Sequence, residues 1–401
     1  MSESKDKLIQ IWWVNQFAVL SGEPGGGRHM QLAKALRNNG IDASIITSSN
    51  NYMSGVRDRT SAQNGVITIP TGWNGKNPIS KFMKMRSFGS KVSKLKWTSN
   101  LPQPKVIIGS SPSLHAAYGA LRLARSKGVP YIFEIRDIWP ESLIQITKLS
   151  KNHPVIHLLK KLERTLVQES DAIISTMPLA CNYYKQYGIS KDKFTWISNG
   201  VDLDAFTNKQ DAKTNGTTVL YAGAHGPPNG IEVMLKAAKI LEDKGSNATF
   251  RFVGSGSIKE ELMQTASILG LKNVSFEPPV PRSQMPSLLQ EADALLIHFE
   301  DLELYQYGVS PNKLFEYMAS GKPVIFATTA SENPLTIANA GIAIEPNNPA
   351  QLASEIERVL TIDKKTRDEQ CGNARNYVIA NNSFDVLAQK TIELIDKVLN
   401  K

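Results

Sequence analysis

Lys313 and Glu316 are the side chains whose types and spacing indicate chemistry most directly. Their stretch, SPNKLFEYMASGKPV (310–324), carries residues typical of helix ends: Ser310 as N-cap, Pro311 and Asn312 in the first turn, Gly321 after the last. A lysine is unfavourable at the positive end of a helix unless an anion such as a phosphate binds there. Glu316 could then accept hydrogen bonds from a ribose diol. The alternative is a solvated helix face with an i, i+3 ion pair.

Three glycine-rich loops would let a ligand approach the backbone closely. SGEPGGGRHM (21–30) precedes a helix that offers amides to a diphosphate, but its third glycine position holds Met30, so a nicotinamide cofactor is not expected. Two weaker signals, which also suit ordinary turns, are FVGSGS (252–257) and YAGAHGPPNG (221–230). His225 in the second loop would either face a phosphate or be exposed. The candidate residues are Gly25, Gly26, Gly27, His225, Gly254 and Gly256.

Two further acidic stretches were considered for catalysis or metal binding. Asp137 lies in EIRDIWPES (134–142) directly after an apolar run, where ligands of open α/β sheets bind, although it could be an exposed turn residue. Asp202 and Asp204 form a D-x-D in NGVDLDAF, with no further carboxylate nearby and no preceding sheet strand. We therefore expect no metal ion.

Strands and helices are predicted to alternate in two series. Apolar runs such as LIQIWWV, KVIIGS and YIFEI are separated by helical stretches, and the alternation restarts after residue 215 with TTVLYAG and ATFRFVG. This pattern is typical of parallel sheets with crossover helices. The expected fold is α/β, with two doubly wound Rossmann-like domains facing across a cleft. Their boundaries are expected at 1–206 and 207–383, with a last helix at 384–401 that would cross back to the first domain.

The 401 residues carry a net charge of +9, and the positive charge is concentrated. Residues 59–133 contain twelve Lys or Arg and no acid, so one part of the first domain is expected to be basic. Two distant cysteines suit a reducing cytoplasm and argue against a disulfide framework. No apolar run is long enough for a signal peptide or a membrane span, so a cytoplasmic protein is expected.

Within the basic region, residues 77–97 suggest an amphipathic helix. Phe82, Met85, Phe88, Val92 and Leu95 recur at helical spacing, although Gly89 weakens the prediction. Such a helix would lie on an anionic membrane surface or simply pack within its domain. Nucleic acid is not expected, because no recognised module accompanies the charge. The candidate membrane or acceptor contacts are Lys81, Lys84, Arg86, Lys91 and Lys94.

Taken together, these motifs resemble the retaining GT-B glycosyltransferases of sequence family 4, over essentially the whole chain. The resemblance is carried by GGG (25–27), ISNGVDLDAF (197–206), VGSGSIKEEL (253–262), VPRSQMPSLLQEADALLI (280–297) and, most strongly, SPNKLFEYMASGKPVI (310–325). RDIWPES (136–142) and SPNKLFEYMA look most like the branch of fucosamine-type transferases in O-antigen and capsule assembly.

The resemblance implies roles for individual residues. Glu316 would bind the nucleotide ribose, Lys313 the diphosphate, and the backbone near Val280 the base. Gly254 and Gly256 would line the nucleotide pocket, and Asp137 would lie beside the transferred sugar. The glycines at 25–27 would approach the diphosphate or sugar. The remaining donor contacts would come from His225 and from the helix start at Ser310, Pro311 and Asn312.

The chain departs from the family pattern at three positions. The family often has a second glutamate where this chain has Gly308, and an Arg and a Lys where it has Ala224 and Asn229. Lys313, His225 and backbone amides would then stabilise the leaving diphosphate.

The implied activity is retaining, metal-independent transfer from a UDP-sugar to a lipid-linked saccharide in bacterial surface polysaccharide assembly. The sugar would be an N-acetylated or deoxy hexosamine, and the enzyme would sit peripherally on the inner face of the cell membrane. Two alternatives stay open at this point: a UDP-sugar epimerase or hydrolase of the same fold, and a non-catalytic nucleotide-binding assembly subunit.

Overall fold

The computed structural model of the protein describes residues 8–21, 23, 27–51, 65–71, 77–94, 101–207 and 215–401. The chain divides into two compact units, Met1–Ser198 with Phe384–Lys401, and Asn199–Ser383. The division therefore falls between residues 198 and 199, before the boundary expected at 206/207, and the last helix belongs to the first unit.

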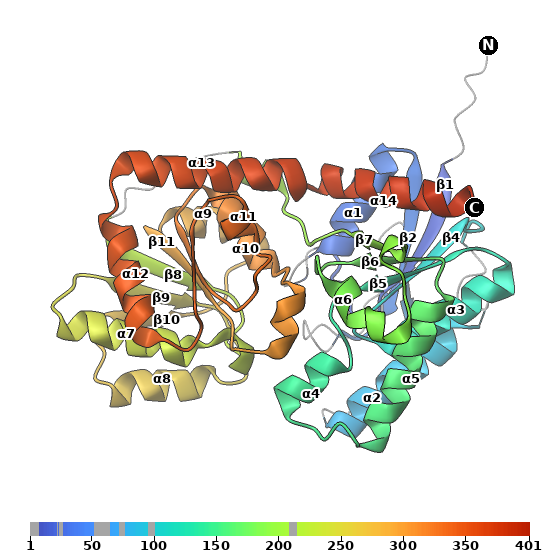
Figure 1. The fold of residues 1–401 in the computed structure, drawn as a ribbon, viewed down its shortest axis with the longest axis horizontal. Coiled ribbons are helices and arrows are strands. Elements are labelled where there is room, and N and C mark those ends of the chain that lie inside the picture. Colours follow the sequence, from blue (N-terminus) through green and yellow to red (C-terminus); the bar gives the residue numbers. More distant parts are fainter. Residues whose placement is uncertain are drawn as a thin grey trace, which may run out of the picture. The chain divides into compact units, whose positions relative to one another are not determined.

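The first unit is built on a seven-stranded parallel sheet of order β3-β2-β1-β4-β5-β6-β7 (Figure 1). Its strands are β1 (Ile9–Val14), β2 (Ile41–Ser48), β3 (Val66–Ile69), β4 (Val106–Ser110), β5 (Tyr131–Ile135), β6 (Ala172–Ser175) and β7 (Phe194–Trp196). The central strands β4 and β5 are buried along their whole length, as is typical of strands covered on both faces. The sequence analysis missed β7, because its three residues are only partly buried.

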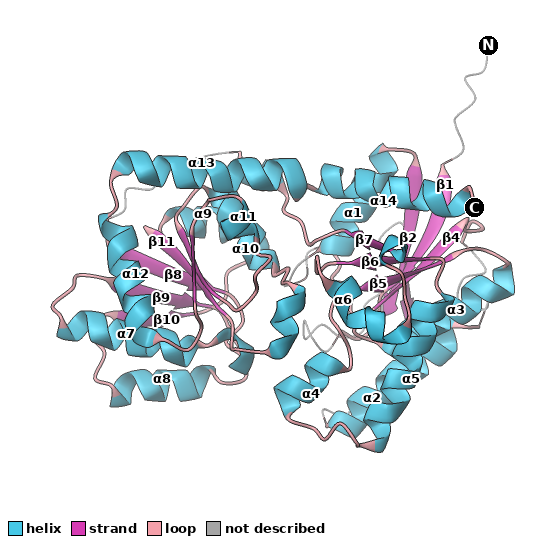
Figure 2. Ribbon diagram, viewed as in Figure 1, coloured by secondary structure: helices cyan, strands magenta, loops and turns pink. Residues whose placement is uncertain are grey.

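Helices cover both faces of this sheet (Figure 2). Leu32 and Leu36 of α1 and Leu387 and Ile395 of α14 share one core cluster with the sheet residues Ile11 and Trp13. The helices of the unit are α1 (Arg28–Asn38), α2 (Pro78–Val92), α3 (Leu114–Lys127), α4 (Glu141–Thr147), α5 (Pro154–Glu169), α6 (Ala180–Tyr184) and α14 (Phe384–Leu399).

The second unit contains a six-stranded parallel sheet of order β10-β9-β8-β11-β12-β13. Its strands are β8 (Thr218–Ala222), β9 (Thr249–Val253), β10 (Val274–Glu277), β11 (Ala294–His298), β12 (Val324–Ala327) and β13 (Ile342–Ile344). Its helices are α7 (Ile231–Asp243), α8 (Lys259–Ile268), α9 (Met285–Gln290), α10 (Asn312–Ser320), α11 (Pro334–Ile337), α12 (Pro349–Thr361) and α13 (Lys364–Asn381).

Alternate residues of these strands enter two separate cores. Leu220 of β8 packs with residues of α9, α10 and α13 on one face, and Val219 packs with residues of α7, α8 and α12 on the other. Two doubly wound parallel sheets confirm the predicted fold class.

Candidate functional site

The ammonium group of Lys313 is held near the start of α10 by neutral partners. Its Nζ donates hydrogen bonds to Tyr221 Oη at 2.8 Å and to Asn229 Oδ1 at 3.1 Å, and lies 4.3 Å from the centroid of the Tyr221 ring. Among the residues that the structure describes, none forms a salt bridge with this lysine. The sequence analysis missed both partners; Asn229 stands where the resembled family has a lysine.

Burial lowers the pKa of Lys313 to about 7. A buried ammonium without an anionic partner is costly, and a bound anion would offset that cost. The lysine is therefore suited to accept a phosphate group at a helix start.

Glu316, one turn into α10, has a different partner from Lys313. Its Oε1 lies 3.3 Å from Nη2 of Arg282, so the i, i+3 ion pair considered from the sequence is not formed. Burial raises the pKa of Glu316, and Arg282 only partly opposes that shift. The glutamate retains a second carboxylate oxygen that can accept hydrogen bonds from a diol.

The start of α10 differs from the prediction by one residue. Pro311, not Ser310, is the N-cap, and no side chain caps the helix. Ser310 lies one residue before the cap, and its hydroxyl accepts the backbone N–H of Asn199 at 2.8 Å. Asn312 is the first helical residue, and Gly321 ends the helix at φ 72°, as expected.

Two glycines after β9 are required by contacts between loops. A Cβ on Gly254, whose φ is 153°, would lie 1.9 Å from the carbonyl oxygen of Gly223, and one on Gly256 would lie 2.0 Å from that of His225. The N–H of His225 donates to the Ser255 carbonyl at 2.8 Å, which ties the loop after β8 to the loop after β9.

The alternative of an exposed histidine at position 225 is wrong. His225 is buried, and among the described residues neither ring nitrogen has a hydrogen-bond partner. Burial lowers its pKa to about 4, with smaller contributions from Lys259 and Lys313, so the imidazole is neutral at pH 7. It can offer one donor and one acceptor to a ligand.

Two further segments border these residues in the second unit. Val280 follows β10 and packs partly buried against the core that contains α10. The short 3₁₀ helix at Glu303–Tyr307 ends at Gly308, where φ is 92°. The position that carries a glutamate in the resembled family therefore has, in this chain, a positive φ that favours glycine.

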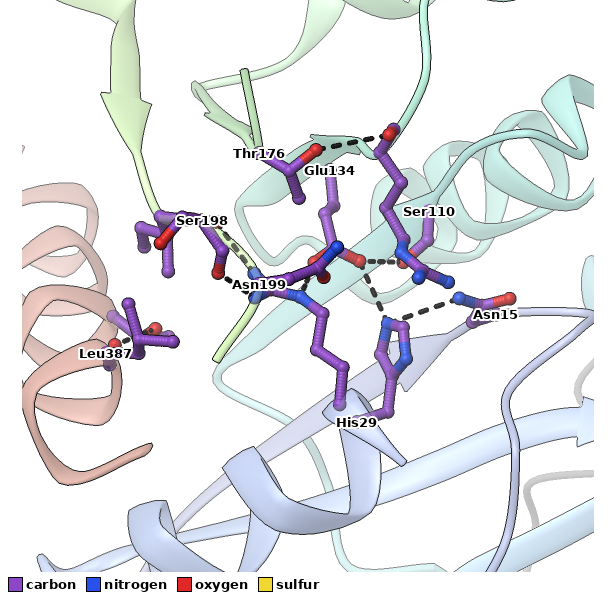
Figure 3. Close-up of polar contacts among 12 residues, drawn as sticks. Asn15, His29, Ser110, Glu134, Thr176, Ser198, Asn199 and Leu387 are labelled. Carbon is purple, nitrogen blue, oxygen red and sulfur yellow. Dashed lines mark hydrogen bonds and ion pairs between the residues drawn. The ribbon is translucent and has the colours of Figure 1, made fainter. Parts of the chain in front are cut away.

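In the first unit, a buried charge network lies at the start of α1. Gly25 and Gly26 are outside the described residues, and Gly27 is the N-cap of α1. Arg28, the first residue of α1, donates from Nε to Glu134 Oε1 at 3.1 Å. His29 Nε2 lies 2.9 Å from Glu134 Oε2, and Ser110 donates its hydroxyl to the same oxygen (Figure 3).

This network holds Glu134 ionised. Burial alone would raise the pKa of Glu134, but His29 and Arg28 outweigh it and the pKa is lowered far below its ordinary range. Arg28 also donates to the carbonyl oxygens of Ile197 and Ser198. One signal for this cluster was present in the sequence: a glutamate within the otherwise apolar strand YIFEI must be paired if it is buried.

Asp137 lies in the loop between β5 and α4. The Ser111 hydroxyl accepts the backbone N–H of Arg136 at 2.9 Å and that of Asp137 at 3.3 Å, which fixes the loop. Burial raises the pKa of the Asp137 carboxyl, despite the lowering effects of hydrogen bonds and of Arg136.

The apolar stripe of α2 packs within its own unit. Phe88 and Val92 are fully buried, the ring centroids of Phe82 and His115 are 5.1 Å apart, and Leu95 is outside the described residues. Gly89 permits this contact, because a Cβ there would lie 2.0 Å from the carbonyl oxygen of His115 on α3. The idea that this stripe lies on a membrane is therefore wrong.

The cations of α2 and of the turn that follows it lie at the surface of the first unit. Lys81, Arg86 and Lys94 are exposed, and Lys84 and Lys91 are partly exposed. Lys91 donates to the carbonyl oxygen of Pro70 at 2.5 Å.

The described part of the chain has neither a metal-binding cluster nor a membrane-spanning helix. It contains no group of three or more His, Cys, Asp or Glu that could hold a metal ion. Within the same residues, no helix combines the length and the hydropathy needed to cross a membrane.

Two family models match the chain. Glycosyltransferase Family 4 matches residues 25–205, and Glycosyl transferases group 1 matches residues 216–362. The putative colanic acid biosynthesis glycosyl transferase WcaI of Escherichia coli (strain K12) is 26% identical over 283 residues, which cover 65% of this chain and 68% of that protein. The D-rhamnosyltransferase WbpZ of Pseudomonas aeruginosa is 23% identical over 223 residues, 53% of this chain and 55% of WbpZ.

Solved structures show the same fold at low identity. Sucrose-phosphate synthase from Thermosynechococcus elongatus has a TM-score of 0.76 at 16% identity, covering 98% of this chain and 99% of that one. Anabaena Alr3699/HepE in complex with UDP and glucose has a TM-score of 0.66 at 16% identity, covering 97% of this chain and 99% of that one.

Proposed function

The chain belongs to the glycosyltransferases of group 1 and family 4 and has the GT-B fold, and we propose that it transfers a sugar from a UDP-sugar to a lipid-linked saccharide with retention of configuration. The sugar is an N-acetylated or deoxy hexosamine, and the product enters a bacterial surface polysaccharide. The names of two relatives, a colanic acid glycosyl transferase and a D-rhamnosyltransferase, support this context. The complex of Anabaena HepE with UDP supports UDP as the nucleotide.

One observation carries the proposal: Lys313 presents an ammonium group with neutral partners near the start of a helix. Transfer breaks the bond between the sugar and the diphosphate, and negative charge grows on the leaving UDP. A fixed cation and helix amides stabilise that charge without reorganising. This chain thereby offsets leaving-group charge with a lysine, and no metal ion is required.

The nucleoside is held by neighbouring residues of the second unit. Glu316 accepts hydrogen bonds from the ribose diol, with Arg282 fixing its other side. The backbone near Val280 meets the base, and Gly254 and Gly256 leave room beside the nucleotide. The loop at Ser310, Pro311 and Asn312 supplies amides, and neutral His225 hydrogen-bonds to a phosphate.

The first unit supplies the acceptor side of the reaction. Asp137 forms a hydrogen bond with the transferred sugar, and the glycines at 25–27 let the diphosphate or sugar approach the backbone. The cations on α2 and just after it (Lys81, Lys84, Arg86, Lys91 and Lys94) attract anionic lipid, which places the enzyme on the inner face of the cell membrane.

A panel of UDP-sugars, each incubated with the full-length protein with and without membrane lipid extract, tests the proposal by UDP release. We expect release with one or a few sugars, and only when lipid is present. Equal release without lipid would identify a hydrolase, and UDP binding without any release would identify a non-catalytic subunit.

Glu316→Ala provides a site-specific check. We expect it to raise the donor KM and reduce turnover, because the ribose diol loses its acceptor. Glu355→Ala, which removes a surface carboxylate paired with Arg358, is the matched control and should leave turnover unchanged. Wild-type kinetics in Glu316→Ala would contradict the assigned role.

A further inference from the structure

Ser198 and Asn199 are consecutive residues that belong to different units, and each is held inside its own unit. Arg28 donates to the carbonyl oxygen of Ile197 at 3.0 Å and to that of Ser198. Since Arg28 is the first residue of α1 and is anchored by Glu134, the chain leaves the first unit from a fixed point.

Asn199 makes the matching contacts in the second unit. Its backbone N–H donates to Ser310 Oγ at 2.8 Å, and its side-chain Nδ2 donates to the Ser310 carbonyl oxygen. Asn199 is 7% exposed. Two hydrogen bonds therefore join the first residue of the second unit to the residue that precedes the N-cap of α10.

The segment that leads from the second unit back to the first is also hydrogen-bonded next to Asn199. The N–H of Val201 donates to the Asn382 carbonyl oxygen at 3.0 Å, and Asn382 Nδ2 donates to the Asn199 carbonyl oxygen at 3.4 Å. Val201 and Ser383 also form an isolated parallel bridge. Within the second unit, the outgoing and returning segments thus meet at Asn199.

The start of α10 needs an external support. No side chain caps this helix, and the residue that was expected to cap it, Ser310, is engaged by Asn199. An uncapped first turn has free amides and frays easily. The contacts of Asn199 fix Ser310, and Ser310 leads through Pro311 into the turn that carries Lys313.

We propose that Asn199 is a positioning residue that fixes the start of α10, and with it Lys313 and Glu316, to the point where the chain crosses between the units. This inference rests on the proposed function, because it assigns diphosphate binding to α10. Its consequence is that donor affinity depends on a residue that touches no substrate, and that loosening the crossing weakens the donor site.

Asn199→Ala in the full-length protein removes the side-chain bond and leaves the backbone bond. Because one hydrogen bond contributes roughly 1 kcal/mol, we expect the Kd for UDP to rise about fivefold. The donor KM should rise by a similar factor while kcat changes less. Asn381→Ala is the matched control: its Nδ2 donates only within α13, to the Tyr377 carbonyl oxygen at 2.9 Å, and its UDP affinity should equal wild type.

Asn199→Asp is a second variant with the same shape but no donor at Nδ2. It sets a carboxylate against the Ser310 carbonyl oxygen, so we expect a larger rise in Kd than for Asn199→Ala. In a Lys313→Ala background, either change should have little further effect on UDP affinity, because the group that it positions is absent.

The rate of amide hydrogen exchange at residues 312–316, measured without a ligand, tests whether Asn199 positions the start of α10. Faster exchange there in both Asn199 variants, with exchange in β8 unchanged, supports the proposal. Unchanged exchange and unchanged UDP affinity would overturn it. If the wild-type protein fails to bind UDP, the proposed function fails, while the exchange result still decides whether Asn199 fixes α10.

Discussion

Arg28 and Lys313 are two shielded cations at comparable places, each within the first two residues of a helix that follows a loop. Arg28 has an anionic partner, Glu134, and also donates to two backbone carbonyl oxygens. Lys313 has only a phenol, an amide oxygen and an aromatic ring. Arg28 thus has an anionic partner inside its own unit, whereas the proposed function assigns Lys313 an anionic partner in the bound donor.

The largest expected effect is the loss of stability when Arg28 is deprived of its anionic partner. Glu134→Gln leaves Arg28 buried without its anion, which should lower the free energy of unfolding by about 3–5 kcal/mol. Urea unfolding followed by circular dichroism measures this. Glu277→Gln, which disrupts the partly exposed pair with Arg251, is the control and should cost about 1 kcal/mol or less. Similar costs for both variants would remove the distinction between the two cations.

Removing the second cation should affect catalysis instead of stability. Lys313→Ala should lower kcat/KM for the donor by about 10²–10³-fold, because the leaving diphosphate loses its fixed positive charge. The free energy of unfolding should stay the same or rise slightly, since a partly buried ammonium without an anionic partner is removed. Lys239→Ala, at an exposed lysine paired with Asp243, is the control. A destabilised Lys313→Ala protein with normal kinetics would reverse the comparison.

The pH dependence of UDP binding further tests whether Lys313, unlike Arg28, binds the ligand. Burial lowers the pKa of free Lys313 to about 7, and a bound diphosphate favours its charged form. The group is already charged below pH 7, so affinity should be constant there on its account. Above pH 7 binding must take up a proton, so affinity should fall by up to tenfold per pH unit. Titration calorimetry in buffers of different ionisation enthalpy detects that proton.

Lys313→Arg is the control for this titration, because a guanidinium stays charged throughout the range. Its UDP affinity should not fall between about pH 7 and 9. An equal fall in both proteins would assign the pH dependence to another group.

The smallest expected effect concerns exposed cations. Arg86→Gln on α2 should weaken binding to vesicles containing anionic lipid by roughly 1 kcal/mol, or about fivefold, and the difference should vanish at high salt. Co-sedimentation measures the bound fraction. Lys365→Gln on α13 is an exposed control that should bind like wild type. Equal losses in both would indicate attraction by net charge alone.

The alternation of apolar runs and helical stretches predicted the parallel strands, because burial on both faces leaves a continuous apolar signal. It missed β7, whose Phe194–Trp196 segment is too short and too exposed to leave that signal. The sequence also identified Lys313 and Glu316 as neighbours on one helix. Their partners Tyr221, Asn229 and Arg282 come from distant segments, and a local pattern contains no information on such pairs.

Because a local pattern contains no information on contacts between distant segments, the environments of His225 and α2 were not predicted correctly. Glycine-rich composition suggested an exposed loop, whereas contacts between the loops after β8 and β9 bury His225. Gly89 was taken as a weakness in a helix, whereas it allows α2 to touch the backbone of α3. In both cases a glycine permits a close contact with a segment that is distant in the sequence.

The turn at Gly308 restricts how this enzyme could be redesigned. Its φ of 92° is strained for any residue with a side chain, so a glutamate grafted there would have to rebuild the turn after Tyr307. A single Gly308→Glu substitution is thus expected to be disfavoured, because the new side chain would have to adopt this positive φ.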